Sequence, residues 1–309
     1  MSVCVIIPCY KDSTTLGRAL DSVYAQTYRV DEIIVVNDAS PETDAIKLVL
    51  KNYPNVFYLE NSVNIGLAAT RNVGVKNASS DIITFLDADD ALHPQKIEWQ
   101  RKFYKEGRVI ACATERVSGD LQSFEGVPYS NRVPYREMKM SIVSLLKNNI
   151  TGASMMISRE LFNSMGGYDE ALLSCEDFDF WLRLLNHGLE IYDVKLPLYI
   201  YVINPSGLSS NLKKISYWEL KVIEKFFSDN INSGKYKYFE SIVLLVWLAR
   251  HRVRYRLCGD TTYKETIDQN VNLIANRPIA RLVFFLFIWM RIDLVLSVLV
   301  NINASRRSL

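Results

Sequence analysis

The first 115 residues alternate between two hydrophobic periods, and this alternation limits the fold more than any other feature of the sequence. Short apolar runs that are typical of strands occur at positions 3–8, 32–36, 56–59, 81–86 and 109–113. Helical patterns follow the first three runs, at positions 12–23, 43–51 and 66–76, and Pro94 opens another. This order predicts βαβ units, and therefore an α/β fold with a mostly parallel, Rossmann-like sheet and helices on both faces.

The rest of the chain is less regular. We expect strands at positions 151–158, 189–194 and 197–202, and a helix at positions 175–186. From residue 216 onward the pattern is helical. The sequence therefore predicts one α/β domain over residues 1–210 and a helical region over residues 211–309.

Charge divides the chain at the same place. Residues 1–210 carry a formal charge of −6 and residues 211–309 a charge of +8, whereas the whole chain of 309 residues carries only +2. A basic tail indicates an anionic partner, either a membrane surface or a nucleic acid, unless its Lys and Arg residues only cover solvated helices. The hydrophobic share of 49% excludes global disorder. Five cysteines without a CxxC pair favour reduced thiols in the cytoplasm over disulfides or a zinc site.

Carboxylates follow two of the predicted strands. Asp38 comes directly after the run EIIVVN, and Asp87, Asp89 and Asp90 come directly after DIITFL. Ligands of parallel sheets bind beyond the carboxyl ends of the strands, so these side chains are placed to meet one. Clustered carboxylates repel one another unless a cation lies among them, and Mg²⁺ typically joins such groups to substrate phosphates. The alternative is an acidic loop whose aspartates cap the helix that Pro94 opens.

Two further side chains can face the same edge of the sheet. Arg71 lies on the predicted helix after Gly66, where its charge could neutralise a phosphate or hold one of the aspartates. Tyr10 follows the first strand and could stack on a base. Taken singly, Arg71 is equally compatible with a solvated position, and Tyr10 with the rim of a site.

These residues belong to a series of short motifs. In order, the strings IIPCYKD, IIVVNDAS, GLAATRN, FLDADD and SCEDFDFWLRL resemble the motifs of family 2 glycosyltransferases, which have the GT-A fold. The similarity covers roughly residues 1–200, and the order and spacing of the motifs are more specific than any single motif. The resemblance implies a nucleotide-diphospho-sugar donor, with a UDP-sugar as the first expectation, bound together with Mn²⁺ or Mg²⁺.

The resemblance also implies a role for each matching residue on the nucleotide side. Tyr10 would stack on the base, with a backbone group at Pro8 beside it, and Asp38 would form a hydrogen bond with the base. Lys11 departs from the asparagine that usually follows the tyrosine. This departure concerns one local contact.

On the diphosphate side, the resemblance places Arg71 near the nucleotide. Asp87 would contact the ribose and Asp89 would bind the metal, with Asp90 as an additional carboxylate.

The string SCEDFDFWLRL carries the acidic pair Glu176 and Asp177. In inverting members of the family, the aspartate takes the proton of the acceptor hydroxyl during a single displacement at the anomeric carbon, a contribution of about 10²–10⁴ in rate. The resemblance makes Asp177 the expected base and Glu176 the second candidate. The alternative is structural, because Ser174 and Asp177 also fit a capping box in which Asp177 would only bind backbone N–H groups.

The tail contains two apolar segments with embedded arginines, at residues 238–256 and 282–300. The second is nearly long enough to cross a bilayer, which takes about 20 residues. Arg291 and Asp293 lie at its centre, where each charge costs about 2.5–3.5 kcal/mol. A segment that lies at the membrane interface therefore fits better than a span. The alternative is a helix buried against the rest of the protein or against a second copy in a homodimer.

These features predict where the protein acts and which acceptor it uses. A tail at the membrane surface places the protein on the cytoplasmic face and fits an acceptor presented on a lipid carrier. The resemblance likewise implies a glycan or lipid-linked sugar acceptor in the synthesis of surface polysaccharide, such as O-antigen, capsule or lipopolysaccharide. The resemblance also implies that processive polymerases of the family carry a QxxRW string after the catalytic base. No such string follows Asp177 in this sequence, so we expect transfer of one sugar per encounter.

Two other functions stay open. A nucleotidyltransferase would carry a glycine-rich phosphate loop after the first strand, where this chain has PCYKDSTT. A non-catalytic nucleotide-sugar-binding or scaffolding protein would not need intact carboxylates at Asp87, Asp89 and Asp177. Nucleic-acid binding is not expected, because the basic residues of the tail alternate with long apolar runs.

Overall fold

The computed structural model describes residues 1–118, 138–147, 150–204, 207 and 212–230. Contacts divide the chain into two units. The first unit, Met1–Leu145 with Asn149–Ser210, contains the sheet and all the predicted site residues. The second unit comprises Leu146–Asn148 and Asn211–Leu309, and its described helix is α8 (Leu212–Asn230).

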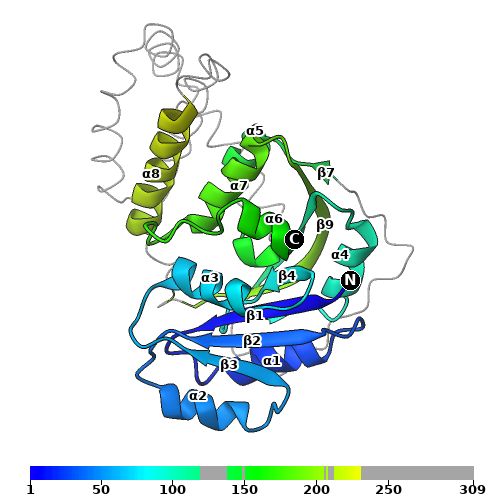
Figure 1. Ribbon diagram of the computed structural model, residues 1–309, viewed down its shortest axis with the longest axis vertical. Helices are drawn as coiled ribbons and strands as arrows, with labels where there is room; N and C mark the ends of the chain where they lie inside the picture. Colours follow the sequence, from blue (N-terminus) through cyan, green and yellow to red (C-terminus); the bar gives the residue numbers. More distant parts are fainter. Residues whose placement is uncertain (119–137, 148–149, 205–206, 208–211, 231–309) are drawn as a thin grey trace, which may run out of the picture. The chain divides into compact units, whose positions relative to one another are not determined.

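The N-terminal part of the sheet is parallel. Its elements are β1 (Val3–Cys9), α1 (Leu16–Tyr24), β2 (Glu32–Asn37), α2 (Thr43–Leu50), β3 (Val56–Glu60), α3 (Leu67–Asn77) and β4 (Ile82–Phe85). The strands lie side by side in the order β3-β2-β1-β4 (Figure 1). Every residue of β1 and β4 is buried, so both faces of the sheet are covered at its centre. This confirms the predicted α/β fold.

Helix α3 packs unusually close to the sheet at Gly74. A Cβ atom at this position would lie 2.4 Å from Cγ2 of Ile6 on β1 and 3.3 Å from Cγ2 of Val36 on β2. Only a residue without a side chain allows this approach. The contact fixes the height of α3 above the strands, and with it the positions of Arg71 and Asn72.

The second part of the sheet is mixed. Its elements are β5 (Ala91–Leu92), α4 (Lys96–Phe103), β6 (Arg108–Val117), β7 (Met138–Lys139), α5 (Ile142–Lys147), the 3₁₀ turn η1 (Gly152–Ser154), β8 (Met156–Ser158), α6 (Arg159–Ser164), α7 (Glu176–Asn186) and β9 (Glu190–Val202). The order continues as β4-β8-β6-β9-β5, and β7 pairs with β9. Strand β8 is antiparallel to both of its neighbours, whereas β6 and β9 are parallel.

The structure corrects two of the predicted strands. Positions 189–194 and 197–202 belong to one strand, β9, because a β-bulge before Pro197 lets the pairing with β6 continue. Lys195 adopts a left-handed φ of 56°, and the register against β6 shifts between Ala111 and Ala113. Positions 151–158 are not one strand, because η1 precedes the short strand β8.

A buried polar cluster ties η1 to the sheet and to α4. The Nζ atom of the fully buried Lys96 donates to Thr84 Oγ1 at 2.8 Å and to Gln100 Oε1 at 2.7 Å. Gln100 in turn donates to the carbonyl oxygen of Ser154 at 2.7 Å. The hydroxyl of Thr84 donates to the carbonyl oxygen of Met155 at 2.6 Å. Burial lowers the pKa of Lys96 to about 8. These bonds fix the backbone at the end of η1.

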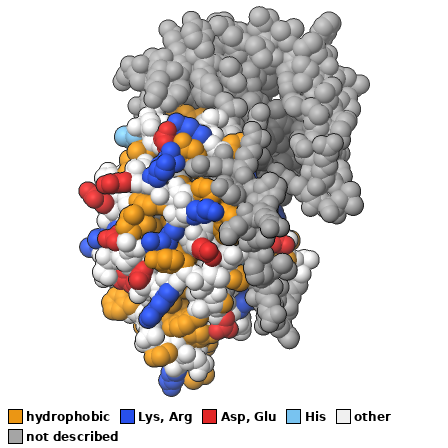
Figure 2. Space-filling view, turned by 90° about the vertical axis from the view of Figure 1, so that its right-hand side faces the viewer, with side chains coloured by type: hydrophobic (Ala, Val, Ile, Leu, Met, Phe, Trp, Pro, Cys, Tyr) orange, Lys and Arg blue, Asp and Glu red, His pale blue; other side chains and the backbone are white. Residues whose placement is uncertain are grey.

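No helix in the described part of the chain is both long and apolar enough to cross a bilayer. The segments at 238–256 and 282–300, on which the membrane prediction rests, lie outside the described residues. On the face shown in Figure 2, Lys and Arg side chains of the described residues are interspersed with Asp and Glu. The cysteines of the described residues are free and buried, and Cys258 lies outside them.

Candidate active site

The predicted site residues lie beyond the carboxyl ends of β1, β2 and β4. Tyr10 directly follows β1, Asp38 directly follows β2, and Asp87 comes two residues after β4. The three strands are neighbours in the sheet and run parallel, so their ends meet at one edge. Helices α3 and α7 bring Arg71 and the pair Glu176 and Asp177 to this edge.

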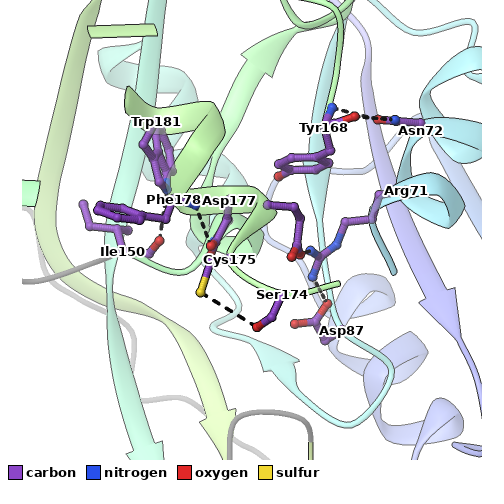
Figure 3. Close-up of polar contacts among 12 residues, drawn as sticks. Arg71, Asn72, Asp87, Ile150, Tyr168, Ser174, Cys175, Asp177, Phe178 and Trp181 are labelled. Atoms are coloured by element: carbon purple, nitrogen blue, oxygen red, sulfur yellow. Dashed lines mark hydrogen bonds and ion pairs between the residues drawn. The ribbon is translucent and has the colours of Figure 1, made fainter. Parts of the chain in front are cut away.

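Arg71 joins two other predicted residues, Asp87 and Glu176, in one network. Its Nη2 lies 2.5 Å from Asp87 Oδ1, and its Nη1 lies 2.6 Å from Glu176 Oε1 (Figure 3). Arg71 and Glu176 are buried, whereas 27% of the Asp87 side chain is exposed. Burial raises the pKa of Glu176, and the guanidinium of Arg71 opposes this shift. Arg71 therefore does hold an aspartate of the DADD string, and it also fixes Glu176.

Asp177 is oriented by backbone donors. Its Oδ2 accepts a hydrogen bond of 2.9 Å from the N–H of Gly152, and its Oδ1 accepts one of 2.7 Å from the N–H of Phe178. The side chain is half-buried. The N-cap of α7 is Cys175, with a left-handed φ of 63° and no side-chain capping bond. The predicted capping box of Ser174 and Asp177 is therefore not formed, because the helix begins one residue later than it requires. Asp177 nevertheless binds backbone N–H groups, as that alternative also required.

Gly152 is a site residue that the sequence did not single out. A Cβ atom on it would lie 2.6 Å from Asp177 Cβ and 2.9 Å from the hydroxyl oxygen of Tyr168. The turn η1 thus contacts α7 through a position that only glycine can fill. A glycine in the string TGAS is the only signal in the sequence, and it does not identify the partner.

The three aspartates of the DADD string lie in different environments. Asp90 is buried and accepts hydrogen bonds from the Tyr199 hydroxyl at 2.6 Å and the N–H of Val202 at 2.8 Å. It therefore ties the loop after β4 to β9. Asp89 is half-buried, and burial followed by the charge of Asp87 raises its pKa.

Asp12 joins this acidic group, although the sequence did not single it out as a site residue. Burial, and then the charge of Asp89, raise its pKa to about 6. Burial is the largest cause of the raised pKa values of Asp12 and Asp89, and the neighbouring carboxylates Asp87 and Asp89 add to it. Among the described residues, no three His, Cys, Asp or Glu side chains already form a metal cage. Half-buried carboxylates fit Mg²⁺ or Mn²⁺, which take few protein ligands and complete their shell with phosphate and water.

The residues predicted to bind the nucleobase differ in how exposed their side chains are. The Tyr10 side chain is 41% exposed, and the Lys11 Nζ lies 5.2 Å from its ring centroid. Pro8 is buried within β1. Lys11, which replaces the usual asparagine, has a left-handed φ of 63°, a region in which asparagine is favoured.

Asp38 already accepts three hydrogen bonds of 2.9 Å, from the N–H groups of Ile65 and Gly66 and from Asn61 Nδ2. These bonds hold the loop that leads into α3. A carboxylate can accept about four hydrogen bonds, so Asp38 has about one acceptor position left for a nucleobase.

Comparisons with known proteins identify the family and the fold of the chain. The family described as "Glycosyl transferase family 2" matches residues 4–166, more than half of the chain. An uncharacterized glycosyltransferase of Rickettsia typhi is 30% identical over 222 residues, which are 70% of this chain and 69% of the relative. Another from Rickettsia felis is 30% identical over 59% of this chain, but the match spans only 31% of that relative.

The fold is also found among solved structures. The crystal structure of Staphylococcus aureus TarS 1–349 in complex with UDP-GlcNAc matches with a TM-score of 0.62 at 20% identity, over 81% of this chain and 72% of that one. At this identity the likeness shows the fold, which is GT-A. The family match, the identity to the Rickettsia typhi relative and the shared fold lead to one conclusion: the chain belongs to glycosyl transferase family 2.

Proposed function

We propose that this protein moves one sugar from a nucleotide-diphospho-sugar to an acceptor hydroxyl, with inversion at the anomeric carbon. The observation that carries the proposal is the network of Arg71, which connects the DADD string to the start of α7. It brings a diphosphate-binding region and a candidate base to the same edge of the sheet.

In the proposed reaction, Asp177 acts as the general base. The acceptor oxygen attacks the anomeric carbon and its proton passes to the Asp177 carboxylate. The bond between the anomeric carbon and the diphosphate oxygen breaks, and its electron pair leaves with the nucleoside diphosphate. Glu176 is less suited to this role, because it is buried and already bound to Arg71.

The donor would lie across the strand ends. Tyr10 would stack on the base, with Pro8 and Asp38 beside it, and Asp87 would contact the ribose through the oxygen that Arg71 leaves free. Asp89 would hold Mn²⁺ or Mg²⁺, which when bound stabilises the charge of the leaving diphosphate. The TarS fragment of the same fold was solved with UDP-GlcNAc, which supports a UDP-sugar as the donor.

The acceptor is proposed to be a glycan or lipid-linked sugar of a surface polysaccharide. The formal charge of +8 on residues 211–309 and their apolar runs support contact with the cytoplasmic face of the membrane. A homodimer through the same region stays a prediction.

The donor is tested by thermal unfolding with a panel of UDP-, GDP- and dTDP-sugars, each with and without Mn²⁺. We expect one UDP-sugar to raise the melting temperature, more so with Mn²⁺, and Asp89→Ala to remove the effect of the metal. The absence of a shift with every nucleotide sugar would contradict the proposal.

The base is tested by substitution of Asp177 with asparagine. The variant keeps the shape of the side chain but cannot take the proton, so slow hydrolysis of the nucleotide sugar in the absence of an acceptor should fall by about 10²–10⁴. The thermal shift with the donor should not change. Asp44→Asn, on the exposed side of α2, changes the charge equally and should retain full activity. Near-normal turnover of a folded Asp177→Asn protein would exclude Asp177 as the base.

A further inference from the structure

The hydroxyl of Tyr168 has no hydrogen-bond partner among the described residues, although it is buried beside the site residues. The Tyr168 side chain is 1% exposed, and its ring packs against Phe85, Phe162 and Phe180 at centroid distances of 5.5, 5.2 and 5.3 Å. An unpaired buried hydroxyl destabilises the folded state. A phenylalanine would make the same ring contacts without this cost, so the hydroxyl needs an explanation other than packing.

The backbone of Tyr168 is bound by Asn72 and its ring is packed among three aromatic rings, so the side chain is held in place. Asn72 on α3 accepts a 3.0 Å hydrogen bond from the Tyr168 N–H and donates a 2.9 Å bond to its carbonyl oxygen (Figure 3). A Cβ atom on the preceding Gly167, whose φ is +66°, would lie 2.8 Å from Asn72 Oδ1. The fold therefore imposes the position of the hydroxyl.

That position is beside Asp177. The Tyr168 hydroxyl and the Asp177 Cβ both lie within 3 Å of one point, the place where a side chain on Gly152 would begin. Four charged groups act on the hydroxyl electrostatically: Arg71 from α3, Asp87 from the loop after β4, and Glu176 and Asp177 from α7. Burial is the largest cause that raises the pKa of Tyr168 well above its usual value, so the hydroxyl stays protonated at neutral pH and can act as a donor.

We propose that Tyr168 is a positioning residue whose hydroxyl donates a hydrogen bond to Oδ2 of Asp177, the oxygen that the N–H of Gly152 already holds, when substrate fills the site. The proposal rests on the role of Asp177 given above. Two donors on Oδ2 would hold the carboxylate in one orientation, in which Oδ1 accepts from the N–H of Phe178 and keeps a second acceptor position for the proton of the acceptor hydroxyl. Hydrogen bonds of catalytic groups commonly shorten only in the substrate complex, which agrees with an unpaired hydroxyl in the free protein.

The experiment compares wild type with Tyr168→Phe by three measurements. The first is kcat and KM for hydrolysis of UDP-GlcNAc with Mn²⁺ as a function of pH. The second is the pKa of the Asp177 carboxyl by ¹³C NMR with UDP and Mg²⁺ present. The third is the melting temperature. Tyr53→Phe is the matched control, because the Tyr53 hydroxyl donates to the Gly17 carbonyl at 3.0 Å and Asp21 Oδ1 at 2.7 Å, away from the site.

For Tyr168→Phe we expect kcat to fall about tenfold while KM stays constant. The acid limb of the pH profile and the Asp177 pKa should both rise, because a donor that stabilises the carboxylate is lost. The melting temperature should stay constant or rise. Tyr53→Phe should instead lower the melting temperature and leave the pH profile unchanged.

An unchanged Asp177 pKa in Tyr168→Phe would overturn the proposal, as would a lower melting temperature with an unchanged pH profile. If wild type hydrolyses no UDP-GlcNAc, the failure concerns the donor of the proposed function. The NMR titration with UDP then still decides whether Tyr168 acts on Asp177. In the double variant Asp177→Asn with Tyr168→Phe, the second substitution should cause no further loss of turnover.

Discussion

Asp12 acquires its properties from residues that are distant from it in the sequence. Its carboxyl group titrates in the field of Asp89 and Asp87, which come after β4, and is also half-buried. In the sequence, Asp12 only marks the start of a helix. A neighbour that the fold supplies cannot be inferred from local pattern, so this member of the acidic group was not predicted.

Substitution of Asp12 by asparagine should change how stability depends on pH. The pKa of about 6 in the folded protein lies above the ordinary value of 3.8, so the folded state binds this proton more tightly than the unfolded chain. The resulting stabilisation is complete below about pH 4 and is lost as the pH rises through about 6. Without metal, Asp12→Asn should therefore gain on the order of 1 kcal/mol relative to wild type between pH 4 and pH 7.

Urea unfolding at a series of pH values, with EDTA present, measures this difference. If the free energies of unfolding of the two proteins changed with pH in parallel, the pKa of Asp12 would not be raised in the folded state. Stability curves that diverge as expected would support the proposal that Mn²⁺ or Mg²⁺ binds at this acidic group.

Arg71 shows how far single residues of the site could be predicted. The sequence placed it on a helix facing the strand ends and allowed it to hold an aspartate, and the structure confirms this contact with Asp87. Its second partner, Glu176, lies more than a hundred positions further along the chain. Pairing at this separation depends on how α7 returns to the sheet, which periodicity does not specify.

At the scale of elements, the contact between η1 and α7 fixes the proposed base. In Gly152→Ala, the added methyl group would have to displace Asp177 or Tyr168, because it would lie under 3 Å from both. We expect a loss of about 1–3 kcal/mol in the free energy of unfolding. Turnover should fall by about tenfold or more, since small misplacements of a catalytic group are costly.

Gly17→Ala in α1 is the matched control. An added Cβ there has only ordinary contacts, with the Tyr53 hydroxyl at 3.6 Å and Val49 at 3.9 Å. The control should stabilise the protein by about 0.5–1 kcal/mol, as is usual for alanine in a helix, and leave turnover unchanged. Equal stability of Gly152→Ala and wild type would mean that η1 moves freely against α7.

The predictability of elements followed their length and regularity. Strands β1 to β4 and their helices were predicted because short apolar runs alternate regularly with helical patterns in this part of the chain. Strand β5, with two residues, and helix α6, with one buried side chain, were missed because neither shows a hydrophobic period. Strand β9 was predicted as two strands, at 189–194 and 197–202, whereas the structure has one strand with an irregular register in between.

At the scale of the whole molecule, the chain consists of two units with opposite charge. Residues up to 210 carry −6 and those from 211 onward +8, and contacts place Asn211 in the second unit. Deletion of residues 270–309 removes Arg277, Arg281, Arg291, Arg306 and Arg307 together with the apolar run at 282–300. Each basic residue near an anionic surface contributes about 1 kcal/mol of attraction. The shortened protein should therefore move from the membrane pellet to the supernatant.

Cell fractionation and sedimentation with anionic vesicles measure this change. Arg306→Gln with Arg307→Gln should weaken vesicle binding by about 2 kcal/mol while leaving the apolar run intact. If the full chain stays in the supernatant without detergent, membrane contact through this segment is wrong.

The neighbouring residues Arg71 and Asn72 have a consequence for recombining relatives of this protein. Arg71 binds Glu176 and Asn72 clamps Tyr168, so one turn of α3 secures the segment from 168 to 176 at two points. A chimera that exchanges this segment alone would combine α3 of one parent with contact partners of the other, and the contacts of Arg71 and Asn72 would no longer be matched. Crossover points chosen to transplant acceptor preference should therefore keep α3 and the segment 168–176 from the same parent.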